Sequence, residues 1–215
     1  MGGKTDEIVI EAFSARFLRA YGRVAAFEGG FSNDPIDRGG ATNHGISLRF
    51  LLAEGKIDLD EDGIADFDLD MDGDIDVADI RKLQPIDAQI LFQRCFWNRL
   101  GCGDYPAPLG EAMFDQGVNG GLGAARKLLQ RAINSASAAC LASKPSPLSV
   151  DGDIGEATRE RLARILNTPC CGMPLLIECY REEAADRYRA IVARIPSQAK
   201  YLKGWLRRAE SLGAA

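Results

Sequence analysis

Apolar side chains recur at helical spacing near the start of the chain, and strand-type alternation is scarce throughout. Successive steps of four, four and three put four apolar residues on one face of a helix over 6–28: Phe13, Phe17, Tyr21 and Val24. Glu28 extends this face by another step of four, and two glycines follow it, as glycine does just past a helix C-terminus. The pattern predicts a mainly α protein whose first helix ends at a carboxyl group.

The remaining apolar stretches also predict helices. Residues 29–47 are rich in Gly, Asn, Asp and Pro, which predicts a long irregular segment with room for a short hairpin. A break at 103–108 divides the chain into a first part over 6–107 and a helical second part over 109–211, packed into one globule. Helices are expected at 46–52, 77–83, 85–100, 109–119, 123–142, 155–167, 173–194 and 198–211.

The net charge of −5 conceals an uneven distribution. Residues 58–79 hold 11 of the 31 acids and no base, so the rest carries 20 acids against 26 bases, a balance of +6. A basic body suits a polyanionic target, and a solvated surface is the alternative. No stretch reaches the roughly 18 apolar residues of a membrane span. The first residues do not form a secretory signal, so synthesis in the cytoplasm is expected.

The six cysteines are irregularly spaced and form no CxxC pair, which predicts buried or incidental thiols rather than a disulfide framework. His44 is the single histidine of the sequence. Zinc amidases and zinc peptidases usually need at least two imidazoles, so both classes are nearly excluded.

Glu28 is the first candidate for a catalytic residue. A carboxyl group that is partly sheltered from water, at the negative end of a helix, keeps its proton more readily than an exposed one. Such a group suits the general acid that protonates the leaving oxygen in glycosidic cleavage. The alternative is an ordinary surface acid at a helix end.

The segment from Glu28 to Ser47 reads EGGFSNDPIDRGGATNHGIS. It resembles glycoside hydrolase family 108, the muramidases of phages and bacteria that include secretion activator proteins. The pieces EGG, NDP, D-x-GG, TN and GIS stand in the family's order, and LFQRCFW at 91–97 continues the likeness. The second half resembles the peptidoglycan-binding module often fused to these enzymes, through AMFDQGVNGGLGAARKLLQRAIN at 112–134, SVDGDIGEAT at 149–158 and KGWLRR at 203–208.

This resemblance implies a lysozyme-like helical fold and hydrolysis of the β-1,4 bond after N-acetylmuramic acid, with Glu28 as the catalytic acid. A more distant likeness to phage-type lysozymes implies Asp37 as base or electrostatic stabiliser and Thr42 as the group that positions the attacking water. A water between the two carboxylates would give inversion, and direct attack by Asp37 retention. The alternatives are a turn-forming Asp37 before two glycines and a local backbone cap at Thr42.

Five polar residues are the expected sugar-binding residues: Asn33, Asn43, His44, Asp115 and Asn119. His44 stands where relatives carry an aromatic or other large residue, so it either stacks on a sugar or fills that space. Asp115 and Asn119 lie one helical turn apart, and helix packing with Asn119 as a cap is the alternative. The basic tail around Trp205 either holds anionic glycan or forms a solvated face around a core tryptophan.

Residues 68–79 match an EF-hand-type calcium loop, with glycine at position 6. Oxygen ligands fall at positions 1, 3, 5, 7, 9 and 12, the seventh through its backbone carbonyl: Asp68, Asp70, Asp72, Asp74, Asp76 and Asp79. The twelfth position is Asp rather than Glu, which offers a shorter reach to the ion. Structural Ca²⁺ is expected, with no cofactor for catalysis, and a disordered acidic loop is the alternative. A poorer second loop starts at Asp58.

Together these features predict a monomeric muramidase that acts on peptidoglycan glycan strands as a phage endolysin or secretion factor, without nucleic acid or membrane insertion. It would reach the wall in the periplasm through a holin-type pore or by lysis. Two alternatives are a lytic transglycosylase on the same glycan and a non-catalytic, calcium-stabilised wall-binding module.

Overall fold

The computed structural model describes residues 13–25, 30–33, 40–58, 61 and 63–214. Helices dominate these ranges, and the strands within them form one two-stranded sheet. The mainly α class expected from the sequence is therefore confirmed. None of the helices in the described ranges combines the length and apolar character that crossing a bilayer requires.

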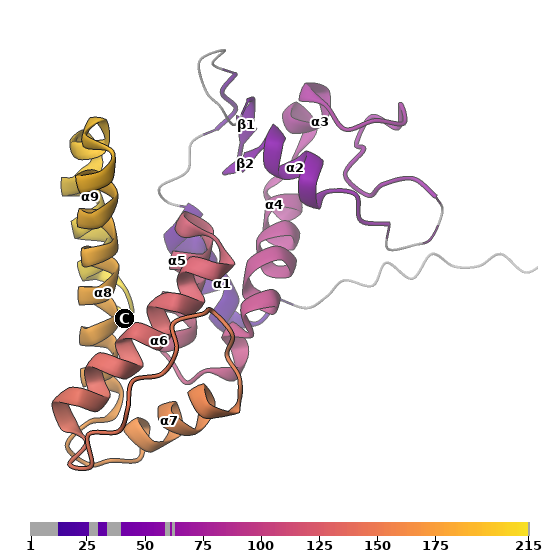
Figure 1. Cartoon of the computed structure of the whole chain (residues 1–215). Helices are drawn as coiled ribbons and strands as arrows, with labels where there is room; N and C mark the ends of the chain where they lie inside the picture. Colours follow the sequence, from indigo (N-terminus) through magenta and orange to yellow (C-terminus); the bar gives the residue numbers. More distant parts are fainter. Residues whose placement is uncertain (1–12, 26–29, 34–39, 59–60, 62, 215) are drawn as a thin grey trace, which may run out of the picture.

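The first half of the chain forms the hairpin and the short helices beside it, at one end of the molecule, and continues to the helices of the second half (Figure 1). Its elements are α1 (Ala15–Ala25), β1 (Thr42–Asn43), β2 (Ile46–Ser47), α2 (Leu48–Glu54), α3 (Val77–Lys82), α4 (Pro85–Phe92), the π-helix η1 (Gln93–Asn98) and the 3₁₀-helix η2 (Cys102–Asp104). The first helix starts later than expected, because the Ser14 hydroxyl accepts a hydrogen bond from the Phe17 N–H at 3.1 Å and caps it. The expectation of one continuous helix from residue 6 is therefore wrong.

The second half is a set of packed helices whose positions match the expected ones to within two residues. The long helices α8 and α9 stand side by side along one edge of the molecule, and α7 lies at the end opposite the hairpin (Figure 1). The elements are α5 (Leu109–Gly120), α6 (Leu122–Cys140), α7 (Glu156–Leu166), α8 (Gly172–Arg194), the 3₁₀-helix η3 (Pro196–Gln198) and α9 (Ala199–Ser211).

An aromatic cluster joins α1 to both halves. Phe17 is fully buried and meets Trp97 of η1 and Phe114 of α5 edge to face, with ring centroids 5.7 and 5.8 Å away. Tyr21, one turn further along α1, meets Phe92 of α4 in the same way at 5.5 Å. Edge-to-face aromatic pairs add to the free energy gained by burial and fix the rotation of a helix about its axis.

An ion pair also fixes α1. The Arg16 guanidinium donates from Nε and Nη2 to the two carboxylate oxygens of Glu111 on α5, both at 2.7 Å. Its Nη1 also donates to the Tyr105 carbonyl at 2.8 Å. Burial is the largest single influence on Glu111 and opposes its ionisation. The hydrogen bonds from Arg16 and from the backbone, together with the charge of Arg16, nevertheless outweigh burial and lower the pKa of that carboxyl group.

The expectation of buried or incidental thiols is wrong for two of the six cysteines. Cys140 and Cys171 form a disulfide that ties the last residue of α6 to the residue before α8. The other cysteines are free, and burial raises the pKa of both Cys95 and Cys179 to about 11, which leaves them as neutral thiols. A separation of 31 residues across an intervening helix leaves no local spacing signal for the bond.

Replacing Phe17 with alanine is expected to reduce the free energy of unfolding by about 3–5 kcal/mol, because it removes a fully buried ring from the aromatic cluster. The matched control is Leu18→Ala, the next residue on α1, whose side chain is 41% exposed. That control should cost no more than about 1 kcal/mol. Urea unfolding of both variants measures the difference, and equal losses would contradict the packing of α1.

The Glu111 carboxylate predicts a pH-dependent contribution to stability. Its pKa is lower in the folded protein than in the unfolded chain, so the contribution is complete above the unfolded value of about 4.3 and is lost as the pH falls through the folded value. Glu111→Gln should therefore cost about 1–2 kcal/mol at pH 7, since both partners are partly exposed. The cost should shrink in unfolding measurements below about pH 4. A cost independent of pH would contradict the ion pair.

Candidate functional site

A tight hairpin follows the first helix. Thr42 pairs with Ser47 and Asn43 with Ile46, which leaves a two-residue turn of His44 and Gly45. Both turn residues have positive φ, 49° and 80°, as a type I′ hairpin turn requires, and histidine tolerates this region better than most residues. His44 therefore sits, partly exposed, at the tip of the hairpin.

The segment 30–33 pairs with the other side of this hairpin. The Ser32 N–H donates to the Thr42 carbonyl at 2.8 Å, and the Thr42 N–H donates back at 2.7 Å. The backbone of Thr42 is thus held by Ser32 on one side and Ser47 on the other. Glu28 and Asp37 lie outside the described residues, while Asn33 is described and exposed.

Asn43 anchors the hairpin to α3. It is 6% exposed, and its amide nitrogen donates to the carbonyls of Ile80 at 2.9 Å and Leu83 at 3.4 Å. Arg81 of α3 lies over the exposed ring of Phe31, 5.2 Å from its centroid. The nitrogen of Asn43 is thus used within the fold, and α3 contacts both the hairpin and the segment 30–33.

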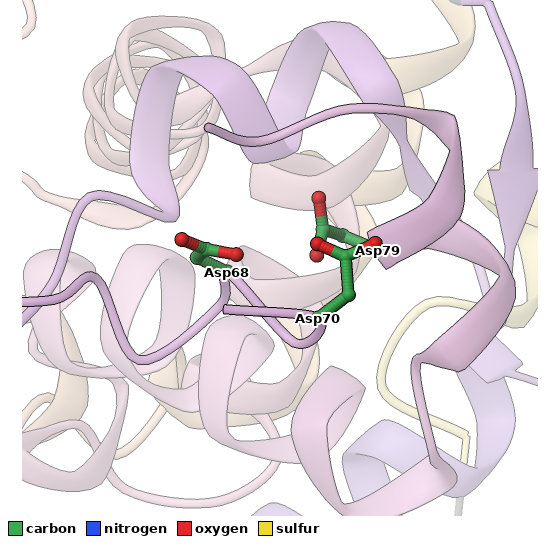
Figure 2. Close-up of side chains that lie close together, drawn as sticks. All are labelled: Asp68, Asp70 and Asp79. Carbon is green, nitrogen blue, oxygen red and sulfur yellow. The ribbon is translucent and has the colours of Figure 1, made fainter. Parts of the chain in front are cut away.

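The acidic loop before α3 brings carboxylates together. Asp68, Asp70 and Asp79 each offer an oxygen within 4.8 Å of the others, and Figure 2 shows them gathered between the loop and α3. Asp74, Asp76 and Asp79 form a second group by the same measure. Asp79 belongs to both groups, as expected for the last ligand of an EF-hand-type loop.

Hydrogen bonds within the loop fold it into this shape. The Asp68 carboxylate accepts from the N–H groups of Asp72 at 3.2 Å and Gly73 at 2.8 Å. The Asp79 carboxylate, fully buried, accepts from Leu69 and Asp76, each at 2.7 Å. Gly73 has a φ of 97°, so the sharp turn falls on the expected glycine. Residues 68–79 therefore form a hydrogen-bonded loop rather than an unstructured acidic stretch.

Asp70 is the member with unused hydrogen-bonding capacity. Its Oδ1 is buried and accepts no hydrogen bond from the described residues, and its nearest cation is Lys82, 4.0 Å from Oδ2. Partial burial, and then repulsion from Asp72 and Asp79, raises the pKa of this carboxyl group. A set of carboxylate oxygens with one buried oxygen unsatisfied suits a hard cation such as Ca²⁺.

The structure brings Asp115 and Asn119 together on α5. The Asn119 amide donates to the Asp115 carbonyl at 2.9 Å, and Asn119 remains exposed. The Asp115 carboxylate accepts from Nε of Arg208 on α9, at 3.0 and 3.1 Å to its two oxygens. Sequence reasoning missed this ion pair, because 93 residues separate its partners.

The tail tryptophan packs within the helical half. Trp205 stacks between Tyr188 of α8 and Tyr201 of α9, with centroid distances of 5.3 and 5.8 Å. It is partly buried against the core. This packing agrees with a core role for Trp205 within the basic tail.

Comparison with known proteins decides the family. Residues 21–121 match the family described as Glycosyl hydrolase 108, and this range runs from the end of α1 through the hairpin and the acidic loop to α5. The first half of the chain is therefore a glycoside hydrolase family 108 domain. Residues 124–210 match the family described as Predicted Peptidoglycan domain. The protein is therefore a glycosidase that acts on peptidoglycan.

Solved structures support the fold. Seven chains match, among them the structure of Brucella abortus SagA, with a TM-score of 0.59 and 20% sequence identity. That match covers 93% of this chain and 96% of the SagA chain, so the helical fold is shared along nearly the whole length. No curated protein matches the sequence.

Proposed function

We propose that this glycosidase is a muramidase, which hydrolyses the β-1,4 bond between N-acetylmuramic acid and N-acetylglucosamine, with Glu28 as general acid. The observation that carries the proposal is the family 108 match over residues 21–121, which includes Glu28, Asp37 and Thr42 in one uninterrupted stretch. The packing of α1 supports it, because a helix fixed by both an aromatic contact and an ion pair gives the chain that enters this stretch a defined starting point.

In the proposed reaction, Glu28 protonates the glycosidic oxygen while Asp37 acts as base or electrostatic stabiliser. The Thr42 hydroxyl positions the attacking water. Its backbone is held on both sides, and its own contact, with the Gly40 carbonyl at 3.4 Å, is long. The Thr42 backbone therefore has a fixed position, and its hydroxyl is available to hydrogen-bond a water.

Five polar residues are proposed to bind the sugar. Asn33 and Asn119 are exposed and His44 is partly exposed, so their side chains are accessible to a glycan. The Asp115 carboxylate accepts a hydrogen bond from the Asn119 amide and so orients that side chain. The side-chain oxygen of Asn43 is the last group of the proposed sugar-binding set.

Because the proposed substrate lies in the periplasmic wall, we propose that the enzyme reaches it through a holin-type pore or by lysis, as an endolysin or a secretion factor.

Glu28→Gln tests the proposal. Purified wild type should release fragments with reducing muramic ends from sacculi, and the variant should be slower by about 10²–10⁴-fold, the usual contribution of a general acid. Mass spectrometry identifies the ends, and Glu210→Gln, an exposed acid of α9, is the matched control. Anhydro-muramic ends would establish a lytic transglycosylase instead. Binding to sacculi without release by the wild type would establish a wall-binding module.

We also propose that Ca²⁺ binds the acidic loop as a structural ion, held by the carboxylates of Asp68, Asp70 and Asp79. The convergence of their oxygens and the unsatisfied Oδ1 of Asp70 support this. Asp79 lies on α3, whose Ile80 carbonyl accepts the hydrogen bond from Asn43. An ion that stabilises α3 would therefore also stabilise the hairpin.

Calcium should raise the melting temperature of the full-length protein. At about 100 times the dissociation constant it would add about 2.7 kcal/mol, a shift of about 5–10 °C for a chain of this size. Asp70→Asn should fold and lose the shift, because it removes the ligand oxygen that the fold does not use. Glu210→Gln should keep it. An equal melting temperature with calcium and with a chelator would contradict the site.

A further inference from the structure

A cleft lies at the end of the molecule away from the hairpin. It has a volume of about 730 Å³. Residues 98–106 line one side, and the other side is formed by Arg126 of α6, the loop 152–154 and the inner face of α7. The cleft thus lies between the segment that matches the hydrolase family and the segment that matches the peptidoglycan family. Figure 1 shows α7 and the hairpin at opposite ends of the chain fold.

Buried polar contacts hold the loop of this cleft in place. Gln130 is 1% exposed, and its amide nitrogen donates to the Asp151 carboxylate and the Asp153 carbonyl, both at 2.8 Å. Its amide oxygen accepts from the Gly152 N–H at 2.7 Å. Gly152 has a φ of 89°, so the turn requires glycine. The SVDGDIGEAT motif therefore serves to build a fixed wall of the cleft.

Charges of both signs face the cleft without pairing with one another. Arg126, Arg159, Asp104 and Asp153 all line it, and within the described chain none of the four makes an ion pair. Arg126 is nevertheless fixed, because its Nη2 donates to a backbone carbonyl at 2.6 Å. The neighbouring Arg99 is different, since Glu54 neutralises it at 2.9 Å.

Apolar side chains complete the lining. Leu100 and the partly buried Tyr105 come from the first half, and Leu162 and Leu166 come from successive turns of α7. Polar and apolar groups thus both line this concave site, and its volume lies in the usual range for a small-ligand site.

We propose that this cleft binds the stem peptides of peptidoglycan, which are short peptides with free carboxylates and a free amino group. Arginine forks pair with carboxylates through two parallel hydrogen bonds, so Arg126 and Arg159 take the acidic groups. Asp104 and Asp153 take the amino group. A polyanion would be repelled by these aspartates, so the mixture of signs selects a zwitterionic ligand. The inference rests on the proposed function for its substrate class and adds a second site to it.

Binding to full-length protein is tested with a synthetic stem tripeptide, L-Ala-γ-D-Glu-diaminopimelate, and with the same tripeptide amidated at its carboxylates. Calorimetry measures affinity, and amide NMR shifts locate the site. The free tripeptide should bind with shifts at 98–106 and 152–166, and amidation should abolish binding. Arg159→Gln should weaken binding about tenfold or more, because it removes one charge-assisted pair. The matched control is Arg131→Gln, an exposed arginine of α6 outside the cleft, which should bind as the wild type does.

The muramidase proposal and the cleft proposal can be tested independently of each other. Tripeptide binding by Glu28→Gln at wild-type affinity supports the cleft whatever that variant does to glycan. Cleavage of sacculi by a wild type that does not bind the tripeptide would overturn the cleft and leave the muramidase standing. Equal affinities for the free and amidated tripeptides, or for Arg159→Gln and the wild type, would also overturn it.

Discussion

The burial of Phe17 between Trp97 and Phe114 is the contact on which the arrangement of the hydrolase segment depends. Three helical elements from distant parts of the chain meet at this one ring. Arg16, the residue before it, is tied to Glu111 on the same partner helix. With both contacts in place, α1 can neither rotate about its axis nor slide along α5 without losing one of them. The chain that continues towards Glu28 therefore leaves α1 at a fixed position.

The π-helix η1 explains how one short stretch reaches three partners. Along the LFQRCFW segment, Phe92 contacts Tyr21 of α1, Phe96 stacks on Phe50 of α2 at 5.5 Å, and Trp97 meets Phe17. The wider turn of a π-helix shifts the side-chain register relative to an α-helix, so neighbouring aromatic rings face different elements. A regular helix with the same residues would not direct these rings in the same way. Trp97 also meets Phe114 of α5 at 5.7 Å, so the segment connects α1 and α2 to the helices of the second half.

Local patterns made most helices predictable, since apolar periodicity depends on residues three and four apart. The acidic loop was predictable for the same reason, because its aspartates and glycine fall within twelve residues. The contacts that fix the site were not predictable in this way. Asn43 meets Ile80 across 37 residues, Asp115 meets Arg208 across 93, and Cys140 meets Cys171 across 31. Each depends on where the chain returns after an intervening element, which no short pattern records.

The stretch that contains η1 and η2 connects α1 to the proposed peptide cleft. The start of this stretch packs against α1, and its end, at 98–106, lines the peptide cleft. One short stretch of chain therefore runs from the aromatic cluster at α1 to the cleft, and relative motion between α1 and the cleft would disturb that cluster. The cleft lies beside α7, at the end of the molecule opposite the hairpin (Figure 1). In the proposed arrangement, a stem peptide in the cleft therefore belongs to a neighbouring part of the wall. Holding that part raises the local concentration of uncut glycan, as a second binding site does in any tethered pair.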